Sequence, residues 1–234
     1  MKPLLLIVIT LFFQTTFAQQ ITLKEWNEQA LTNIRLLPKY GNKEKTDGQK
    51  EADKEFIETT LAKDTSHRKA SDHLIELGFK YLYRDVKTAM YRFNQAYLLD
   101  STNSDIYWGF AAVYMVLQDY KKAEKQYQEG LLVNPKSTHL LTDYGTYFIV
   151  QHYNLRSTDV TGAMSNLNTA IDYMKKSYQL DSKDPNTAFK LSAAYFENGD
   201  CANAWKFYDE CKALGGQPIT DDYTKDLTEQ CKRN

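Results

Sequence analysis

The sequence predicts an all-α protein built from a row of antiparallel helix pairs. Three observations lead to this prediction: a shortage of turn-forming residues, amphipathic segments with helical spacing, and a pattern of large and small residues that returns along the chain. The 234 residues include only 10 Gly and 5 Pro, but 17 Tyr and 11 Phe. Few turn formers and many long side chains favour helices with short connections over a β-sandwich.

The N-terminal residues have the pattern of a secretory signal peptide. Lys2 supplies a positive charge, residues 4–13 are an apolar stretch, and Thr16 and Ala18 are small residues that precede a cut after Ala18. The apolar stretch would span only about 15 Å as a helix, half of a bilayer core, so stable membrane insertion is not expected. We therefore expect export to the periplasm or beyond, with residues 1–18 removed.

Residues 19–70 are expected to form a helical extension ahead of the repeating part. Thr22 and Glu25 form a capping-box pattern, which opens a predicted helix that runs to about Leu37. A second helix is predicted over residues 49–62, after a polar loop. The expected apolar faces of these helices consist of Trp26, Ala30, Ile34, Leu37, Phe56, Ile57 and Leu61.

Two units of 34 residues, 104–137 and 185–218, align with each other throughout their length. In the first half of each unit, a large residue is followed by a small one and then by an aromatic residue. The second half contains an alanine, an aromatic residue and a small residue, in that order. The matching residues are Phe110, Ala111, Tyr114, Ala123, Tyr127 and Gly130 in one unit, and Leu191, Ser192, Tyr195, Ala204, Tyr208 and Cys211 in the other. The flanking units 71–103 and 138–184 follow the pattern with one residue fewer and 13 more, the extra residues lying within 151–165.

The 34-residue period and this order of residues resemble the tetratricopeptide repeat. The resemblance covers residues 71–218 and implies four helix pairs, stacked as a right-handed superhelical solenoid (an α-α superhelix) that buries a continuous core. Residues 219–234 follow the last pair. They are expected to form a capping helix from about Asp221 to Cys231, with its charged residues facing solvent.

In tetratricopeptide proteins the first helices of successive pairs line a concave groove. By this resemblance, the groove residues expected here are Ile75, Phe79, Trp108, Ala112, Met115, Thr142, Thr146, Ile149, Phe189, Ala193 and Phe196. The variant of the repeat that grips C-terminal carboxylates carries Lys, Asn and Arg at such positions, where this chain has Asp105, Trp108 and Ala112. The resemblance therefore implies an apolar, aromatic groove rather than a carboxylate clamp.

Two occupants of this groove remain open. In one interpretation, a helix or an extended peptide of an unidentified partner protein docks there, with Trp108, Phe189 and Phe196 as anchors. In the other, the N-terminal extension fills the groove with residues such as Trp26 and Phe56, because an in-chain segment is always present at high effective concentration. An apolar groove on an exported protein should not stay bare.

The 13 extra residues within 151–165 are a second candidate for binding. Insertions in solenoids often form loops on the binding face, and Tyr153, Leu155 and Arg156 could then contact a partner. The alternative is a longer helix pair that packs against its neighbours.

Three cysteines remain after export, too few and wrongly spaced for a zinc site. Cys201 lies 15 residues before the turn near Gly216, and Cys231 lies 15 residues after it. This symmetry predicts a disulfide across the last hairpin, with Cys211 as a free core thiol. The alternative is three unpaired thiols.

The remaining observations argue against catalysis and nucleic-acid binding. The net charge is −1, with 29 basic and 30 acidic residues and no basic stripe. No catalytic motif is present, and the four histidines are not spaced as metal ligands. We therefore expect no catalytic residues, metal or cofactor, and a non-catalytic interaction module of the cell envelope. The alternative is a structural envelope component that associates with itself, its groove filled by its own N-terminal helices.

Overall fold

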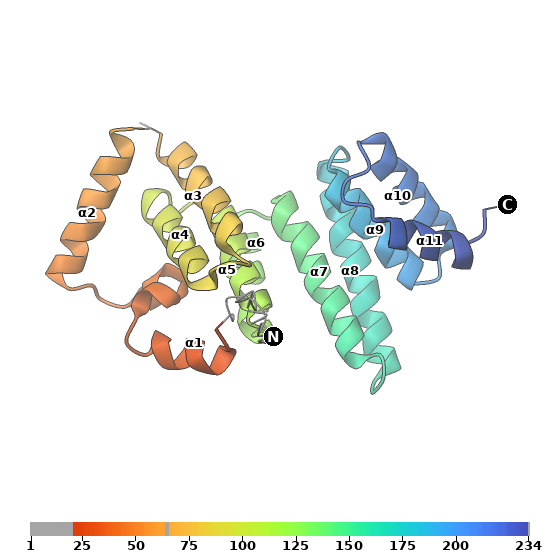
Figure 1. Ribbon diagram of the computed structural model, residues 1–234, viewed down its shortest axis with the longest axis horizontal. Helices are drawn as coiled ribbons and strands as arrows, with labels where there is room; N and C mark the ends of the chain where they lie inside the picture. Colours follow the sequence, from red (N-terminus) through yellow and green to blue (C-terminus); the bar gives the residue numbers. More distant parts are fainter. Residues whose placement is uncertain (1–20, 64–65, 234) are drawn as a thin grey trace, which may run out of the picture.

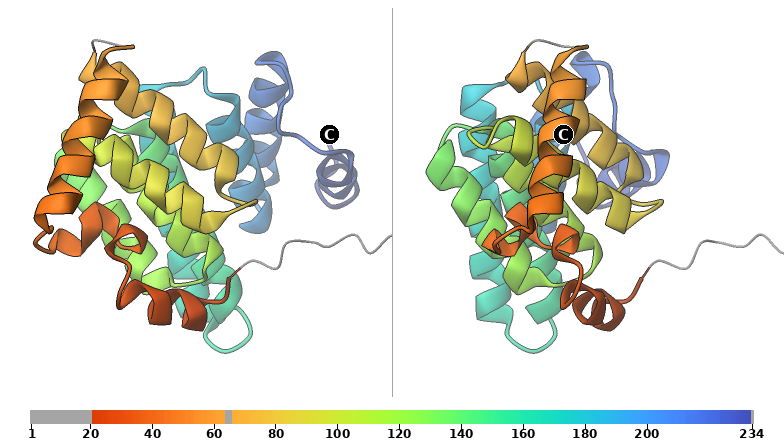
Figure 2. Two further views of the ribbon diagram at one scale, coloured as in Figure 1. Left: turned by 60° about the vertical axis from the view of Figure 1, so that its left-hand side comes forward. Right: turned by 90° about the vertical axis from the view of Figure 1, so that its left-hand side faces the viewer.

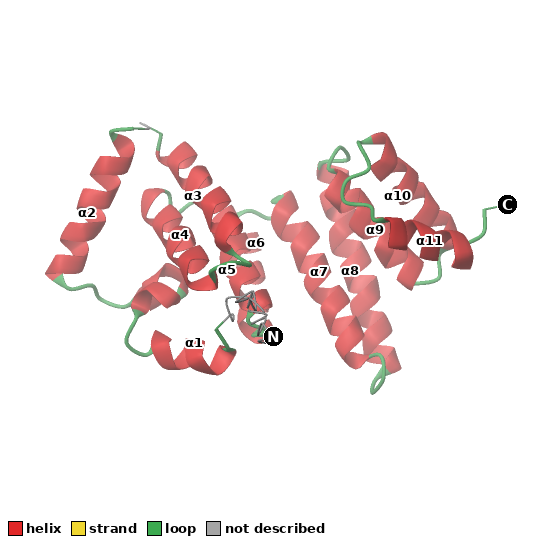
Figure 3. Ribbon diagram, in the orientation of Figure 1, coloured by secondary structure: helices red, strands yellow, loops and turns green. Residues whose placement is uncertain are grey.

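The computed structural model describes residues 21–63 and 66–233, and within these ranges the chain contains helices and loops but no strand (Figure 3). The predicted signal peptide lies outside the described residues. The α-helices are α1 (Leu23–Ala30), α2 (Asp47–Leu61), α3 (His67–Tyr81), α4 (Val86–Leu99), α5 (Asp105–Val116), α6 (Tyr120–Val133), α7 (Thr138–Leu155), α8 (Val160–Leu180), α9 (Pro185–Glu197), α10 (Cys201–Ala213) and α11 (Asp221–Gln230). Two short 3-10 helices, Ile34–Leu36 and Pro38–Asn42, separate α1 from α2.

Helices α3 to α10 form four antiparallel pairs that stack side by side in chain order (Figure 1). The pairs are α3/α4, α5/α6, α7/α8 and α9/α10. The first pair begins earlier than residue 71, at His67, because the Ser66 side chain accepts a hydrogen bond from the backbone N–H of Lys69 and caps α3 there. Ser71 lies within the helix and is fully buried.

Each second helix of a pair begins with an aspartate cap. The side chains of Asp85, Asp119, Asp159 and Asp200 accept a hydrogen bond from the backbone N–H three residues later, at 2.9–3.2 Å. A carboxylate at this position satisfies a free N–H group and faces the positive end of the helix dipole. The four aspartates therefore set where each turn between paired helices ends.

Small residues allow neighbouring helices to approach closely in the core. The ring of Phe93 on α4 lies between Gly78 of α3 and Gly109 of α5. The ring also makes an edge contact with Phe110, at 6.5 Å between ring centroids. Phe93, Gly109 and Phe110 thus join the first two helix pairs into one continuous core.

The third pair is longer than the others, with 18 residues in α7 and 21 in α8. The predicted insertion loop is absent, because the extra residues extend both helices; Tyr153 and Leu155 belong to α7, and Arg156 caps its end. The buried His152 links the two longer helices, because its Nδ1 donates to the Ala163 carbonyl at 2.9 Å. The alternative of a longer helix pair is therefore the observed one.

The N-terminal extension departs from the predicted continuous helix. Helix α1 ends at Ala30, so the expected continuation to Leu37 is wrong. Asn33 begins a 3-10 turn by accepting a backbone hydrogen bond with its side chain. Leu37 has extended backbone angles, φ −106° and ψ 138°, because the ring of Pro38 disfavours a helical conformation in the preceding residue. The second predicted helix is present as α2.

This extension packs against the second helices of the first two pairs. Asn94 of α4 is fully buried, and its Nδ2 donates to the carbonyl oxygens of Arg35 and Leu37 at 2.9 and 3.0 Å. Lys39 forms an ion pair with Glu129 of α6 at 2.5 Å. Figure 2 shows α1 and α2 on the outside of the array, at the end formed by α3 and α4.

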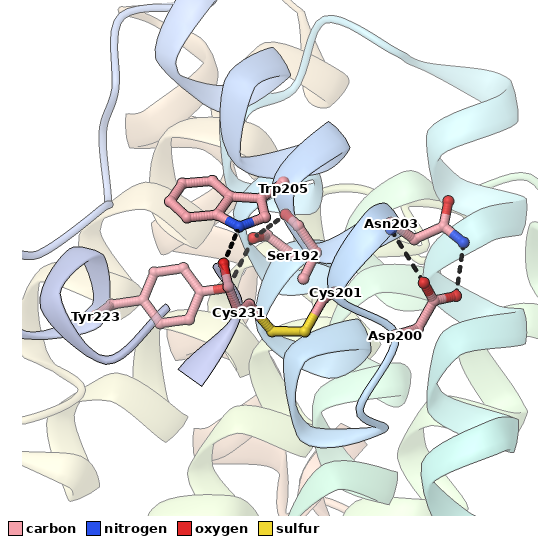
Figure 4. Close-up of a disulfide and its surroundings, with 8 residues drawn as sticks. Ser192, Asp200, Cys201, Asn203, Trp205, Tyr223 and Cys231 are labelled. Carbon is pink, nitrogen blue, oxygen red and sulfur yellow. Dashed lines mark hydrogen bonds between the residues drawn. A yellow bond between two sulfur atoms is a disulfide. The ribbon is translucent and has the colours of Figure 1, made fainter. Parts of the chain in front are cut away.

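Helix α11 covers the opposite end of the array. Cys201 at the start of α10 and Cys231 just after α11 form a disulfide, with Cα atoms 5.3 Å apart, while Cys211 is free and buried. The indole Nε1 of Trp205 donates to the Cys231 carbonyl at 2.6 Å, beside the disulfide (Figure 4). Within the described ranges, no helix has the length and apolar character needed to cross a bilayer.

Candidate functional site: the groove

The first helices of the four pairs line a common open hollow, which we call the groove. Its central part has a volume of about 590 Å³ and receives side chains from α3, α5, α7 and α9, with Tyr127 contributed by α6. The residues that define it are Phe79, Leu82, Tyr83, Trp108, Ala112, Met115, Val116, Tyr127, Asp143, Thr146, Asn186 and Lys190. Helices far apart in the sequence thus contribute to one surface.

Three aromatic rings lie in a row along the groove, the first two tilted by 39° and the last two stacked. The ring centroids of Phe79 and Trp108 lie 4.0 Å apart, and those of Trp108 and His139 lie 4.4 Å apart with an interplanar angle of 14°. Each ring comes from a different helix, α3, α5 or α7. We call this set the aromatic ladder. Because Phe79 and Trp108 are half-buried, part of their apolar surface stays available to a ligand.

The polar edge of Trp108 is held by a carboxylate. Its Nε1 donates to Asp143 Oδ2 at 2.5 Å, and Lys190 Nζ donates to Asp143 Oδ1, also at 2.5 Å. Asp143 and Lys190 expose about a quarter of their side chains. The network connects α5, α7 and α9 and restricts the orientation of the indole. Less side-chain entropy is therefore lost when a ligand binds to this ring.

A second hollow of about 650 Å³ continues the groove at the side of α3 and α5. It is lined by Asp72, Ile75, Glu76, Phe79, Lys80, Asp105, Trp108 and His139. Asp105 Oδ2 and His139 Nδ1 are 2.9 Å apart. This hydrogen bond raises the pKa of His139 above its usual value of 6.5, and the nearby carboxylates of Asp143 and Asp184 act in the same direction.

The α9 end of the groove is partly covered by α11. The Tyr223 ring makes edge contacts with Phe189 at 5.3 Å and with Phe196 at 5.9 Å, and its hydroxyl hydrogen-bonds to Ser192 at 2.7 Å (Figure 4). A small hollow of about 110 Å³ remains between α7 and α9 and includes Ile149 and Phe189. The capping helix therefore limits the length of open groove.

Nine of the eleven residues expected to line the groove do line these hollows, and two lie elsewhere. The nine are Ile75, Phe79, Trp108, Ala112, Met115, Thr146, Ile149, Phe189 and Ala193. Thr142 is 2% exposed and shares hydrogen bonds with Ser177 and Thr187 at 2.8 and 2.6 Å, so it belongs to the contact between α7, α8 and α9. Phe196 packs with α11 instead of facing the groove.

The residues proposed for an insertion loop take part in contacts between helices. The Tyr153 hydroxyl donates to Glu197 Oε2 at 3.0 Å, and Glu197 Oε1 lies 3.2 Å from His152 Nε2. Arg156 lies over the Tyr153 ring at 4.8 Å, and Leu155 is half-buried at the end of α7. Tyr153 also borders the small hollow, so it alone of the three predicted residues reaches the groove.

Apart from Asp105, the charged residues of the groove were not found from the sequence. His139 and Asp143 are four residues apart on α7, and Lys190 lies on the inner face of α9. The spacing of His139 and Asp143 places them on one helix face, and this could have suggested that both face inward with Thr146. The expectation of an apolar, aromatic groove is therefore incomplete.

The prediction that the N-terminal helices fill the groove is wrong for the described part of the extension. None of the residues that line the three hollows comes from 21–63. The physical reason is that the apolar side chains of this segment are used elsewhere: Trp26 and Leu36 are fully buried in the core cluster that includes α4. Within the described ranges, no group of three His, Cys, Asp or Glu residues could hold a metal ion.

Comparisons with known proteins agree with this architecture. No protein-family model matches the chain. Among curated proteins, it is 23% identical to the type IV pilus assembly protein PilF of Pseudomonas aeruginosa, over 67% of this chain and 72% of that protein. Among solved structures, it is similar to TTC0263, a thermophilic TPR protein of Thermus thermophilus, with a TM-score of 0.56, 14% identity, and coverage of 68% of this chain and 80% of that one.

A second solved structure, the APC/C hetero-tetramer Cut9–Hcn1, matches with a TM-score of 0.54 and 15% identity, over 85% of this chain and 36% of that one. The chain therefore has the tetratricopeptide fold, and the predicted solenoid of antiparallel helix pairs is confirmed. At these identities the likeness establishes the fold, and function must be argued from the groove.

Proposed function

We propose that this protein is a non-catalytic scaffold that holds a segment of a partner protein in the groove. The observation that carries this proposal is the aromatic ladder of Phe79, Trp108 and His139, which is held in place by Asp143 and is not covered by the described part of the chain. Ordered aromatic residues in a hollow surface are the usual anchors of protein interfaces. A rigid ladder loses little entropy when a ligand binds.

We further propose that the protein works in the cell envelope, after export and cleavage behind Ala18. The sequence pattern of residues 1–18 supports export. The similarity to a type IV pilus assembly protein supports a role in assembling an envelope structure. Mass spectrometry of the protein recovered from the envelope fraction tests the cleavage: a mature chain beginning at Gln19 is expected, and an intact Met1 in all the recovered protein would contradict it.

The groove is tested by site-specific crosslinking in the native cell. A photoreactive amino acid replaces Met115 in the groove, or Lys121 on the exposed side of α6 as the matched control. We expect a crosslinked protein at position 115 that is absent at 121. That protein, once identified and purified, should bind Trp108→Ala at least about tenfold more weakly than the unaltered chain, a loss of about 1.4 kcal/mol.

Two outcomes would count against the proposal. Equal crosslinking at both positions, or equal affinity for the unaltered chain and Trp108→Ala, would remove the groove from the interaction. Recovery of a second copy of this chain at position 115 would favour the alternative of a self-associating envelope component.

A further inference from the structure

The charges around one part of the groove are unbalanced. The hollow beside α3 and α5 is lined by three carboxylates, Asp72, Glu76 and Asp105, and by a single lysine, Lys80. The whole chain, by contrast, has a net charge of only −1. This hollow therefore has more acidic than basic side chains beside the aromatic ladder.

These carboxylates are not neutralised by lysine or arginine. Asp72 accepts a hydrogen bond from Asn103 Nδ2 at 2.7 Å, and Asp105 accepts one from Ser137 Oγ at 3.2 Å. Within the described ranges, neither Asp72 nor Glu76 takes part in an ion pair. Within the described ranges, the one ionisable partner of Asp105 is His139, at 2.9 Å.

Asp143, on the central part of the groove, has a basic partner, because it is paired with Lys190 at 2.5 Å. Within the described ranges, the three carboxylates of the second hollow have no lysine or arginine partner, and they lie together next to Phe79 and Trp108. Exposed carboxylates in a hollow with low-dielectric walls produce a local field that attracts cations.

The ladder and the carboxylates share the same hollow. Phe79 and Trp108 line both the central part of the groove and its acidic part. A basic side chain that enters here can place its apolar stem on the exposed parts of these rings while its charged end reaches the carboxylates. An acidic segment would be repelled by the same three groups.

We propose that the groove binds a basic, extended segment of a partner protein, in which an arginine or lysine lies among Asp72, Glu76 and Asp105 and a neighbouring apolar residue lies on Phe79 and Trp108. This inference rests on the proposed function, because it names the chemistry of the partner that the scaffold holds. Charge complementarity is the argument for it: the groove offers carboxylates to its ligand, the opposite of a site that grips carboxylates.

The inference is tested by selecting random dodecapeptides displayed on phage against the full chain. Enriched peptides are synthesised, and their affinities are measured by fluorescence polarisation for the unaltered chain, Trp108→Ala, Glu76→Lys and Glu58→Lys. Glu76 is exposed, so its replacement should not disturb folding. Glu58, exposed on α2, provides the same charge change away from the groove. Circular dichroism verifies that each variant is folded.

We expect the enriched peptides to carry arginine or lysine beside an apolar residue. Their dissociation constants should rise about tenfold or more for both Trp108→Ala and Glu76→Lys, and stay within about twofold for Glu58→Lys. Binding to the unaltered chain should weaken as salt increases from low to physiological concentration, because exposed charges are screened.

The other outcomes separate the inference from the proposed function. Peptides that require Trp108 but lack basic residues, and bind Glu76→Lys as tightly as the unaltered chain, would overturn the inference while the scaffold function stands. An absence of peptides sensitive to Trp108→Ala would overturn the scaffold function itself. A concentration-dependent increase in size that is lost in Glu76→Lys would identify a second copy of this chain as the occupant instead.

Discussion

The ring of Phe93 fills the space that a Cβ atom on Gly109 would occupy, since the ideal position of that atom lies 2.3 Å from the ring. Gly78, on the other neighbouring helix, stands in the same relation to Phe93, also at 2.3 Å. Two glycines, each on the first helix of a different pair, thus leave the space that one phenylalanine on α4 occupies. The stacking of the first two pairs depends on this close contact between the two glycines and Phe93, because interiors packed to this density leave no room for an added methyl group.

Gly109→Ala should therefore destabilise the protein, by about 1–3 kcal/mol, because Phe93 must leave its position to admit the methyl group. Urea unfolding followed by circular dichroism measures this change. The matched control is Gly48→Ala in α2, where nothing lies within 4 Å of the added atom and alanine should be neutral or stabilising by up to about 1 kcal/mol. Equal stability of both variants would contradict the proposed close packing of Phe93 against Gly109.

Replacing Cys201 and Cys231 together with serine should destabilise the C-terminal end. The disulfide closes a sequence separation of 30 residues, and a loop of that length corresponds to roughly 3–4 kcal/mol in the chain-entropy description. A reducing agent should lower the unfolding free energy of the unaltered chain by a similar amount and leave the double variant unchanged. Three reactive thiols in the denatured, unreduced protein would show that the bond is not formed.

Asp143→Ala should destabilise the protein by about 1–3 kcal/mol, because it removes the acceptor of both Trp108 Nε1 and Lys190 Nζ. A double-mutant cycle with Lys190→Met separates the energy of the ion pair from the other effects of each single substitution. The coupling should be favourable but below about 1 kcal/mol, because both side chains keep contact with water. Additive effects of the two substitutions would mean that the pair contributes nothing to stability.

His139 should make stability and binding depend on pH. The hydrogen bond to Asp105, with further attraction from Asp143 and Asp184, raises the pKa of His139 above 6.5 in the folded state. The protonated form is thus favoured by folding, so its contribution is fully present below about pH 6.5 and is lost as the pH rises through the raised pKa. The effect should be below about 1 kcal/mol, because the side chain is 54% exposed.

The measurement is the pH dependence of unfolding for the unaltered chain and for His139→Gln, whose curves should converge as the pH increases from about 6.5. Binding should change in the opposite sense. A basic peptide is repelled by protonated His139, so its affinity should increase with pH in the unaltered chain and be flat in His139→Gln. Parallel curves for the two proteins in both measurements would exclude His139 as the responsible group.

Much of the fold could be predicted because its determinants are local. Aspartates such as Asp119 and Asp200 end the turns within pairs by hydrogen bonds that span three residues, and small residues such as Gly109 repeat at the helix contacts. The symmetry of Cys201 and Cys231 about the last turn could likewise be read along the chain. The extension was predicted less well, because α1 ends at Ala30 and a 3-10 turn begins at Asn33, although the apolar spacing continues to Leu37.

The sequence by itself determined the helix pairs, their order and which face of each helix is apolar, because periodicity and capping act within a few residues. Only the tertiary structure decided which residues pack against each of these helix faces. Periodicity indicates that His139 and Asp143 share a face of α7. It does not show that the packing of α5 beside α7 stacks His139 on Trp108 and brings Asp143 into hydrogen-bonding distance of the indole Nε1. It likewise did not show that the extension packs on α4 and leaves the groove open, since an amphipathic helix can bury its apolar face against any complementary surface and packing selects among them.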